Sequence, residues 1–144
     1  MFGKFLTAFS APAPTPAPDA PLALSALLVR LARADGDYSP TEAAGIDRLI
    51  AGRYGMSAFE ATAARRGGEA LEADAPDTVR FTRALKDAVP YEDRAGLMEA
   101  LWSVALSDGG RDAEEDALIR LAASLLGVSD RDSALARQRV ERGT

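Results

Sequence analysis

The stretch "ARADGDYSPTEAAGIDRLI" (residues 32–50) returns in similar form as "ALSDGGRDAEEDALIRL" (residues 105–121). In each, an apolar helical run ends at Asp-Gly, and a second helical run begins a few residues later. Four positions match at a constant spacing of 73 residues: Asp35, Gly36, Glu42 and Ile46 with Asp108, Gly109, Glu115 and Ile119. The chain therefore contains an internal repeat, with units at about residues 24–60 and 97–132.

The end of each repeat unit carries a second shared signal. "YGMS" (residues 54–57) matches "LGVS" (residues 126–129). A glycine directly after a helix is typical of a left-handed C-cap, and a following serine favours the N-cap of the next helix. Two such units are too few for a solenoid, so we expect a pseudo-symmetric helical bundle.

Apolar residues recur at helical spacing from Pro21 onward, and no window alternates with the period of a strand. The prediction is an all-α fold of about seven helices in two pseudo-symmetric halves forming a compact bundle. Ser39-Pro40-Thr41-Glu42 combines an N-cap serine, a proline at the first helical position and a capping-box glutamate. Ser57 with Glu60 and Ser129 with Asp132 predict two further helix starts.

The helical pattern also predicts where helices begin and which residues face inward. The first helix ends near Asp35-Gly36, Gly67-Gly68 weakens the third, and Pro76 and Pro90 open the fourth and fifth. The expected apolar stripes are Leu24, Leu28 and Leu31; Ala43, Ile46 and Ile50; Phe81, Leu85 and Val89; Leu97, Leu101 and Val104; and Leu118, Leu121 and Leu125.

The N-terminal residues differ from the rest of the chain. Residues 11–21, "APAPTPAPDAP", hold five of the eight prolines and predict an extended linker before a domain at residues 22–144. Residues 1–10 form a short amphipathic segment whose Phe2, Phe5, Leu6 and Phe9 share one helical stripe. This short apolar helix would dock on its own domain or on another copy, stay loose, or bind a protein partner or a membrane surface.

Composition narrows the chemistry. The formal charge of −5 disfavours binding to nucleic acid, and no apolar run is long enough for an integral membrane segment. Without Cys or His, the chain has no thiolate nucleophile and lacks the commonest general base. We therefore expect a cytoplasmic protein that is not an enzyme and has no organic cofactor. The remaining oxygen ligands suit Ca²⁺, Mg²⁺ or Mn²⁺.

The two acidic segments, residues 35–42 and 108–115, are candidate cation sites. The ligands would be Asp35, Asp37 and Glu42 in the first segment and Asp108, Asp112 and Glu115 in the second. Asp35 and Asp108 each follow the C-terminal end of a helix, where a negative charge is disfavoured unless something compensates it. Neither segment has the glycine and glutamate of an EF-hand loop, so binding would be weaker.

A purely structural interpretation of these acids is also open. Asp35 and Asp108 would accept hydrogen bonds from free N–H groups of the following helix, and Glu42 and Glu115 would complete capping boxes. Arg33 and Arg111 are available as ion-pair partners. Elsewhere, Met98 and Trp102 fit a core better than a ligand platform, while Arg65, Arg66, Arg137, Arg139 and Arg142 fit solvated helix faces.

The paired motifs "LARADGDYSPTEAAGIDRLI" and "EALWSVALSDGGRDAEEDALIRLAASLLGVSD" resemble the TerB family, a tellurite-resistance-associated helical domain. They are also similar to the N-terminal domain of DjlA-type co-chaperones. The resemblance covers roughly Leu22 to Asp132. It implies two pseudo-symmetric helical halves with an acidic surface that binds divalent metal through Asp35, Glu42, Asp108 and Glu115.

Two positions depart from the family pattern. Ser107 replaces the alanine of the Ala-Asp-Gly motif, and Gly110 stands where the first segment has Asp37. The resemblance favours a cation-binding module with a stress-response role of the tellurite-resistance type. The alternative is a metal-free protein-interaction or co-chaperone-like module. A reduction of tellurite would need electrons from a thiol or a cofactor, and the sequence supplies neither.

Overall fold

A computed structural model describes residues 18–34, 38–75, 77–107 and 113–143 of this chain. These residues form helices and no strand, which confirms the predicted all-α fold. The predicted apolar helix at residues 1–10 lies outside the described residues. The helices are, in chain order, α2 (Ala20–Arg33), α3 (Pro40–Tyr54), α4 (Ala58–Asp74), α5 (Val79–Ala88), the 3-10 helix η1 (Tyr91–Asp93), α6 (Arg94–Ala105), α7 (Ala113–Leu126) and α8 (Asp130–Gly143).

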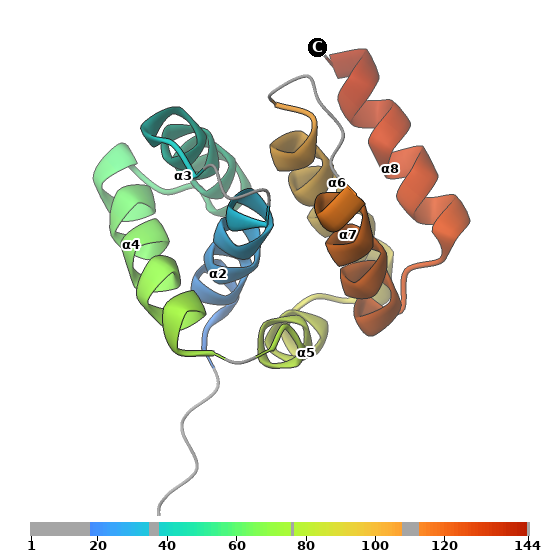
Figure 1. Cartoon of the computed structure of the whole chain (residues 1–144), viewed down its shortest axis with the longest axis horizontal. Coiled ribbons are helices and arrows are strands. Elements are labelled where there is room, and N and C mark those ends of the chain that lie inside the picture. The colour runs from blue at the N-terminus through green and yellow to red at the C-terminus, as the bar shows by residue number, and fades with distance from the viewer. Residues whose placement is uncertain (1–17, 35–37, 76, 108–112, 144) are drawn as a thin grey trace, which may run out of the picture.

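Helix α2 is the centre of the fold. Every side chain from Ala23 to Val29 is buried, so this helix is surrounded on all sides. It packs against α3, α4, α5, α6 and α7 (Figure 1). Asp19 caps its start by accepting a hydrogen bond from the amide of Leu22 at 2.9 Å.

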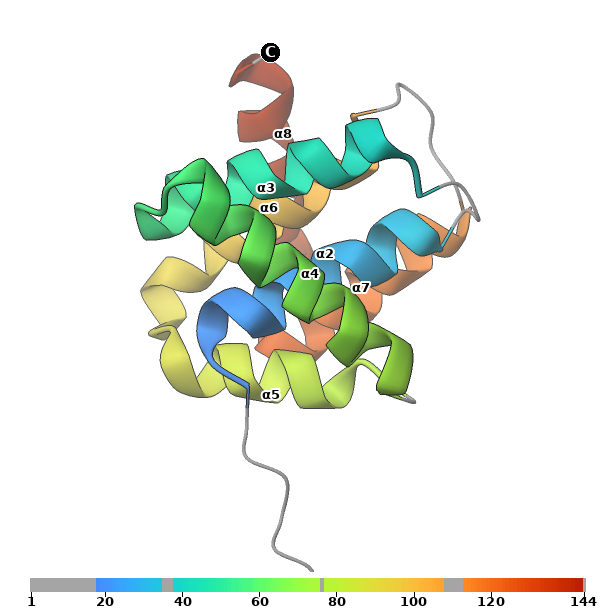
Figure 2. The same cartoon turned by 90° about the vertical axis from the view of Figure 1, so that its left-hand side faces the viewer.

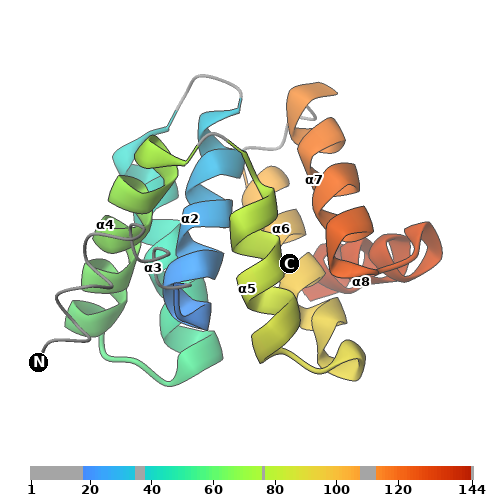
Figure 3. The same ribbon diagram turned by 90° about the horizontal axis from the view of Figure 1, so that it is seen from below.

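Six of the helices form two similar halves, one that contains α2 and one that contains α6. Helices α2, α3 and α4 form one half of the molecule, and α6, α7 and α8 form the other (Figure 1). The halves meet where α2 contacts α6, where α3 contacts α6, and where α7 contacts α2. Helix α5 lies across the junction and packs against α2 and α7 (Figure 3). Helix α3 of the first half contacts α6, and the equivalent helix α7 of the second half contacts α2. This correspondence is the pseudo-symmetry that the repeat predicts.

The two glycine caps are confirmed. Gly55 and Gly127 have φ angles of 62° and 74°, the left-handed region that a residue with a Cβ avoids. The amide after each glycine donates to the carbonyl five residues earlier, at 3.0 and 2.8 Å, which closes a Schellman-type turn. Ser57 and Ser129 then accept hydrogen bonds from the amides of Glu60 and Asp132, both at 3.1 Å.

Helix starts predicted from proline are partly confirmed. Pro76 lies outside the described residues, and α5 begins at Val79. Pro90 precedes the single 3-10 turn η1, after which α6 begins at Arg94. The predicted inward residues of these two helices, Phe81, Leu85, Val89, Leu97, Leu101 and Val104, are all buried.

The predicted apolar stripe of α7 is wrong at Leu121 and only partly confirmed at Leu118, which packs against the core. Leu121 is 47% exposed, and Leu118 and Leu125 are only half-buried. The helix instead buries a neighbouring face with small side chains, which lets it lie close to the core. The buried residues of α7 are Glu115, Ile119, Ala122, Ala123 and Leu126.

Gly67 and Gly68 do not weaken α4 in the way that their low helix propensity predicts. The helix continues without interruption to Asp74. A Cβ at position 68 would lie 2.6 Å from the Cβ of Ser25 and 2.8 Å from the amide nitrogen of Ala26. The glycine therefore allows α4 to approach the backbone of α2, and its cost in propensity is offset by that packing.

Candidate functional site

Most of the predicted cation ligands lie outside the described residues. These are Asp35, Asp37, Asp108 and Asp112, together with the nearby Arg111. Glu42 and Glu115 are described, each in the first turn of its helix. The described residues contain no group of three acidic side chains placed to hold a metal ion, but this finding does not test the full set of six.

The helix ends that flank the two acidic segments lie at the same end of the molecule. The C-terminal ends of α2 and α6 and the N-terminal ends of α3 and α7 all lie on the right in Figure 2. A cavity of about 520 Å³ lies between two of these helix ends, because residues from the start of α3 and the end of α6 line it. Its lining includes Ser39, Glu42, Ile46, Val104 and Ser107.

Glu42 takes part in the capping box predicted for α3. Its carboxylate accepts a hydrogen bond from the amide of Ser39 at 3.3 Å. In return, the hydroxyl of Ser39 accepts one from the amide of Glu42 at 3.1 Å. The structural interpretation of this glutamate is therefore confirmed. A metal ion bound to the Glu42 carboxylate would share that carboxylate with the amide of Ser39.

Glu115 has a different environment at the corresponding position of α7. Its side chain is 4% exposed, whereas Glu42 is only half-buried. Both carboxylates have partners within the protein. A buried carboxylate needs such partners, because desolvation without them costs several kcal/mol. The two glutamates are thus equivalent in sequence but unequal in exposure.

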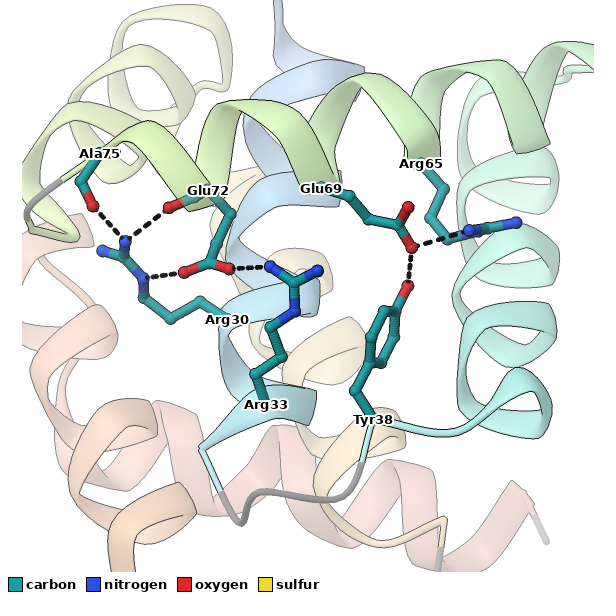
Figure 4. A network of polar contacts seen from close by, with 7 residues as sticks. All are labelled: Arg30, Arg33, Tyr38, Arg65, Glu69, Glu72 and Ala75. Carbon is teal, nitrogen blue, oxygen red and sulfur yellow. Dashed lines mark hydrogen bonds and ion pairs between the residues drawn. The ribbon is translucent and has the colours of Figure 1, made fainter.

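A polar network beside the first acidic segment joins α2 to α4 (Figure 4). Arg30 donates to the carboxylate of Glu72 at 3.1 Å and to the backbone carbonyls of Glu72 and Ala75 at 3.2 and 2.6 Å. Its guanidinium also lies over the ring of Phe81, 5.0 Å from the centroid. Arg30 thereby satisfies carbonyls at the end of α4, where helical partners are missing.

Arg33 joins the same network. It is available in the sequence as a partner for the acidic segment, but in the structure its guanidinium donates to the carboxylate of Glu72. Glu72 therefore lies between two arginines of α2, with a side chain that is 14% exposed (Figure 4). Arg33 also lies over the ring of Tyr38, 5.2 Å from the centroid.

A second part of the network joins α3, α4 and Tyr38. The Tyr38 hydroxyl donates to Glu69, which also accepts from Arg65 at 2.8 Å (Figure 4). Arg65 donates from Nε to Asp47 at 2.7 Å. The interpretation of Arg65 as a solvated residue is wrong, because its side chain is 14% exposed and pairs with two carboxylates. Thr62 completes the group by donating to Asp47 at 2.9 Å.

These contacts shift the pKa values of three groups. Burial and the hydrogen bond to Glu69 raise the pKa of Tyr38 to about 12. The hydrogen bond to Asp47 raises the pKa of Arg65, against the effect of burial. Burial opposes the change at Glu69, but hydrogen bonds from Tyr38 and Arg65 lower the pKa of that carboxyl below its usual range. At neutral pH the network is a neutral tyrosine between fixed charges.

Three members of this network are not predicted from the sequence: Asp47, Glu69 and Glu72. The spacing of Arg65 and Glu69, one helical turn apart, is a local signal that could have found one pair. The contacts of Asp47 and Glu72 cross between helices, so only the packing of α2, α3 and α4 reveals them. The network joins α2, α3 and α4 beside the first acidic segment, and its arginines and carboxylates are paired with one another.

Met98 and Trp102 are confirmed as core residues. Met98 is fully buried, and Trp102 is 8% exposed. The indole N–H of Trp102 donates to the carbonyl and hydroxyl oxygens of Ser133 at 3.1 and 3.2 Å. This contact joins α6 to α8. Arg137 lies over the indole ring, 5.2 Å from its centroid, so it is less solvated than predicted.

No helix in the described part of the chain is both long and apolar enough to cross a membrane.

Comparisons with known proteins identify the family. No curated protein and no solved structure matches the chain. Residues 21–138 match the family described as tellurite resistance protein TerB. Because this match spans all the described helices except the start of α2 and the end of α8, the chain belongs to the TerB family.

Proposed function

We propose that this TerB-family chain is a cytoplasmic, non-enzymatic module that binds a divalent cation through its two acidic segments in a stress response of the tellurite-resistance type. The observation that supports it most is the common end of the molecule at which all four flanking helix ends lie (Figure 2). The six candidate ligands lie in the sequence between those helix ends or within the first turn after them: Asp35, Asp37, Glu42, Asp108, Asp112 and Glu115.

The carboxylates, and not the helix ends, favour a cation there. The C-terminal ends of α2 and α6 carry partial negative charges, but the N-terminal ends of α3 and α7 lie at the same end of the molecule and carry opposite ones. Carboxylates gathered at this end repel each other unless a positive charge lies between them. Arg33 does not supply that charge to the segments in full, because it pairs with Glu72. Oxygen ligands of this kind select Ca²⁺, Mg²⁺ or Mn²⁺.

The two segments should contribute unequally. Gly110 removes one carboxylate from the second segment, and Glu42 is already engaged in a capping box in the first. Neither segment has the ligand set of an EF-hand, so an ion would keep several waters. We therefore expect affinities in the range from tens of micromolar to millimolar, weaker than those of dedicated calcium buffers.

Calorimetric titration of the full chain with Ca²⁺, Mg²⁺ and Mn²⁺ tests this proposal. We expect saturable heat with at least one ion and its loss in the double variant Asp35→Asn with Asp108→Asn. Asp74→Asn, at the exposed end of α4 and outside the acidic segments, is the matched control and should bind as the unaltered chain does. Absence of heat with all three ions at millimolar concentration would contradict the proposal.

A second candidate is a metal-free module for protein interaction. It is supported by Phe59, which is 84% exposed in the first turn of α4, and by the cavity of about 520 Å³ between α3 and α6. Aromatic side chains are enriched in protein–protein interfaces relative to the rest of the surface. Under this alternative, partner capture would be unaffected by a chelator and would be weakened by Phe59→Ser. A shortened chain that begins at Asp19 would show whether residues 1–18 contribute.

A further inference from the structure

One ion pair of the first half has no counterpart in the second. Arg65 on α4 donates to Asp47 on α3, from Nε at 2.7 Å and from a terminal nitrogen at 3.4 Å. The repeat places Arg137 on α8 at the position of Arg65 and Arg120 on α7 at the position of Asp47. The carboxylate that joins the two helices in the first half is thus replaced by a second guanidinium.

Arg137 keeps the other partner of its counterpart. Arg65 pairs with Glu69, and Arg137 pairs with Glu141, in both cases four residues later in the helix. The Arg137–Glu141 pair is looser, with 3.4 Å between Nε and the carboxylate. The same Nε atom is buried and makes no hydrogen bond with any described residue. In Arg65, this is the atom that makes the short bond to Asp47.

A cavity lies beside both arginines. It has a volume of about 480 Å³ and lies between α6, α7 and α8. Arg120 and Arg137 line it, together with the apolar surfaces of Trp102, Ile119 and Ala123. Two acids, Asp116 and Asp130, line it as well. The charges of the lining therefore balance, which favours a ligand with one negative group over a polyanion.

We propose that the cavity between α6, α7 and α8 binds a carboxylate group carried on an apolar stem. The carboxylate accepts hydrogen bonds from Arg120 and from Nε of Arg137, and it thus takes the place that Asp47 has in the first half. The stem packs against Trp102, Ile119 and Ala123. Planar guanidinium groups suit this task because they bind a carboxylate through paired hydrogen bonds. The inference does not depend on cation binding.

The only tryptophan of the chain lines the cavity, so its fluorescence reports directly on occupancy. Titration of the full chain with 4-methylpentanoate should shift or quench the emission of Trp102 with saturation at millimolar concentration. The neutral amide 4-methylpentanamide, which has the same stem, should give at least a tenfold weaker response. An equal response to the acid and the amide would overturn the proposal.

A second arm of the experiment distinguishes the two sources of such a group. The peptide acetyl-Leu-Asp-Leu-amide carries the carboxylate on a polypeptide side chain. Stronger binding of this peptide assigns the cavity to an acidic residue of a protein partner, and stronger binding of the free acid assigns it to a small carboxylate. Failure of both probes to change the fluorescence at 20 mM, a concentration of the order expected for weak single-site ligands, overturns the proposal.

Arg120→Asp provides the sharpest variant, because it restores the residue type of the first half. The new carboxylate should pair with Arg137, lower the affinity for the probes at least tenfold, and leave the melting temperature unchanged or higher. Arg131→Asp is the matched control, since it makes the same charge change on α8 outside the lining. Unchanged binding by Arg120→Asp, or an equal loss in both variants, would overturn the assignment.

Discussion

The two halves of the molecule follow the same path through three helices but differ at the crossing of their first and third helices. In the first half, Ser25 of α2 faces Gly68 of α4 so closely that a Cβ on the glycine would meet backbone atoms. At the repeated positions of the second half stand Met98 and Val140, a fully buried and a partly buried side chain. Small residues permit close approach of the helices, and large ones keep them apart.

This difference in side-chain size accompanies a difference in polar contacts. The close approach of α2 and α4 brings Arg30 and Arg33 within reach of Glu72 (Figure 4). In the second half, Ser103 stands at the position of Arg30 and donates to the carbonyl of Glu99 within its own helix. The contact between α6 and α8 uses Trp102 and Ser133 instead. A repeated backbone therefore does not require repeated side-chain contacts.

Removal of the close approach should have the largest effect. Gly68→Ala places a Cβ 2.6 Å from Ser25 and 2.8 Å from the Ala26 amide, so the helices must move apart. We expect the free energy of unfolding to fall by about 3 kcal/mol, at the upper end of the range for overpacked cores. Chemical denaturation measures this change.

Gly52→Ala is the matched control for that substitution. It lies within α3, and a Cβ there would meet no atom within 4 Å. Because alanine is the better helix former, this variant should be more stable by about 0.5–1 kcal/mol. Equal effects of the two substitutions would mean that helix propensity, and not close packing, explains Gly68.

Loss of the Arg30 contacts in the polar network should lower the free energy of unfolding by less than Gly68→Ala does. Arg30→Met keeps an unbranched apolar side chain but removes every hydrogen bond to Glu72 and Ala75 and the guanidinium over the ring of Phe81. We expect a loss of about 2 kcal/mol, since the acceptors are partly buried and one of them is charged. Urea denaturation should show it, and salt should change it little, because burial limits screening. A loss below about 0.5 kcal/mol would show that water replaces the guanidinium.

The contact between Trp102 and Ser133 in the second half should contribute less to the free energy of unfolding than this network does. Trp102→Phe removes the donor to Ser133 and part of the buried ring. We expect a loss of about 1.5 kcal/mol, from one net hydrogen bond and a small cavity. In the double variant with Ser133→Ala, the losses should not add, because both substitutions break the same contact. Full additivity would mean that the hydrogen bond to the Ser133 hydroxyl contributes nothing, since alanine keeps the bond to the backbone carbonyl.

Local signals in the sequence predict much of this fold. Ser39, Gly55 and Gly127 act within one helical turn, so their roles follow from neighbours in the chain. Contacts between helices do not follow in this way. The roles of Arg65 and Gly68 depend on the positions of α2 and α3, which no short window contains.

The errors in α7 and in the candidate site have separate causes. Helix α7 is apolar on more than one face, so spacing alone does not decide which face is buried, and the small Ala122 and Ala123 prevail over Leu121. Of the candidate ligands, the structure tests only the capping role of Glu42. The cation set remains a prediction, because ligand geometry depends on segments outside the described residues.

The smallest expected effect concerns Glu69 and depends on pH. The pKa of its carboxyl is lowered in the folded state, so its ionised form stabilises the fold above the unfolded value of 4.5. This contribution is lost as the pH falls through the lower folded pKa. We expect Glu69→Gln to cost at most about 1 kcal/mol at pH 7, because the side chain is partly exposed. The difference should vanish in strong acid, as pH-dependent denaturation would show.

Glu141→Gln is the equivalent change in the second half, where the pair is looser and the carboxylate is 51% exposed. Its effect at pH 7 should be smaller, and an equal effect would show that the Tyr38 hydrogen bond adds nothing.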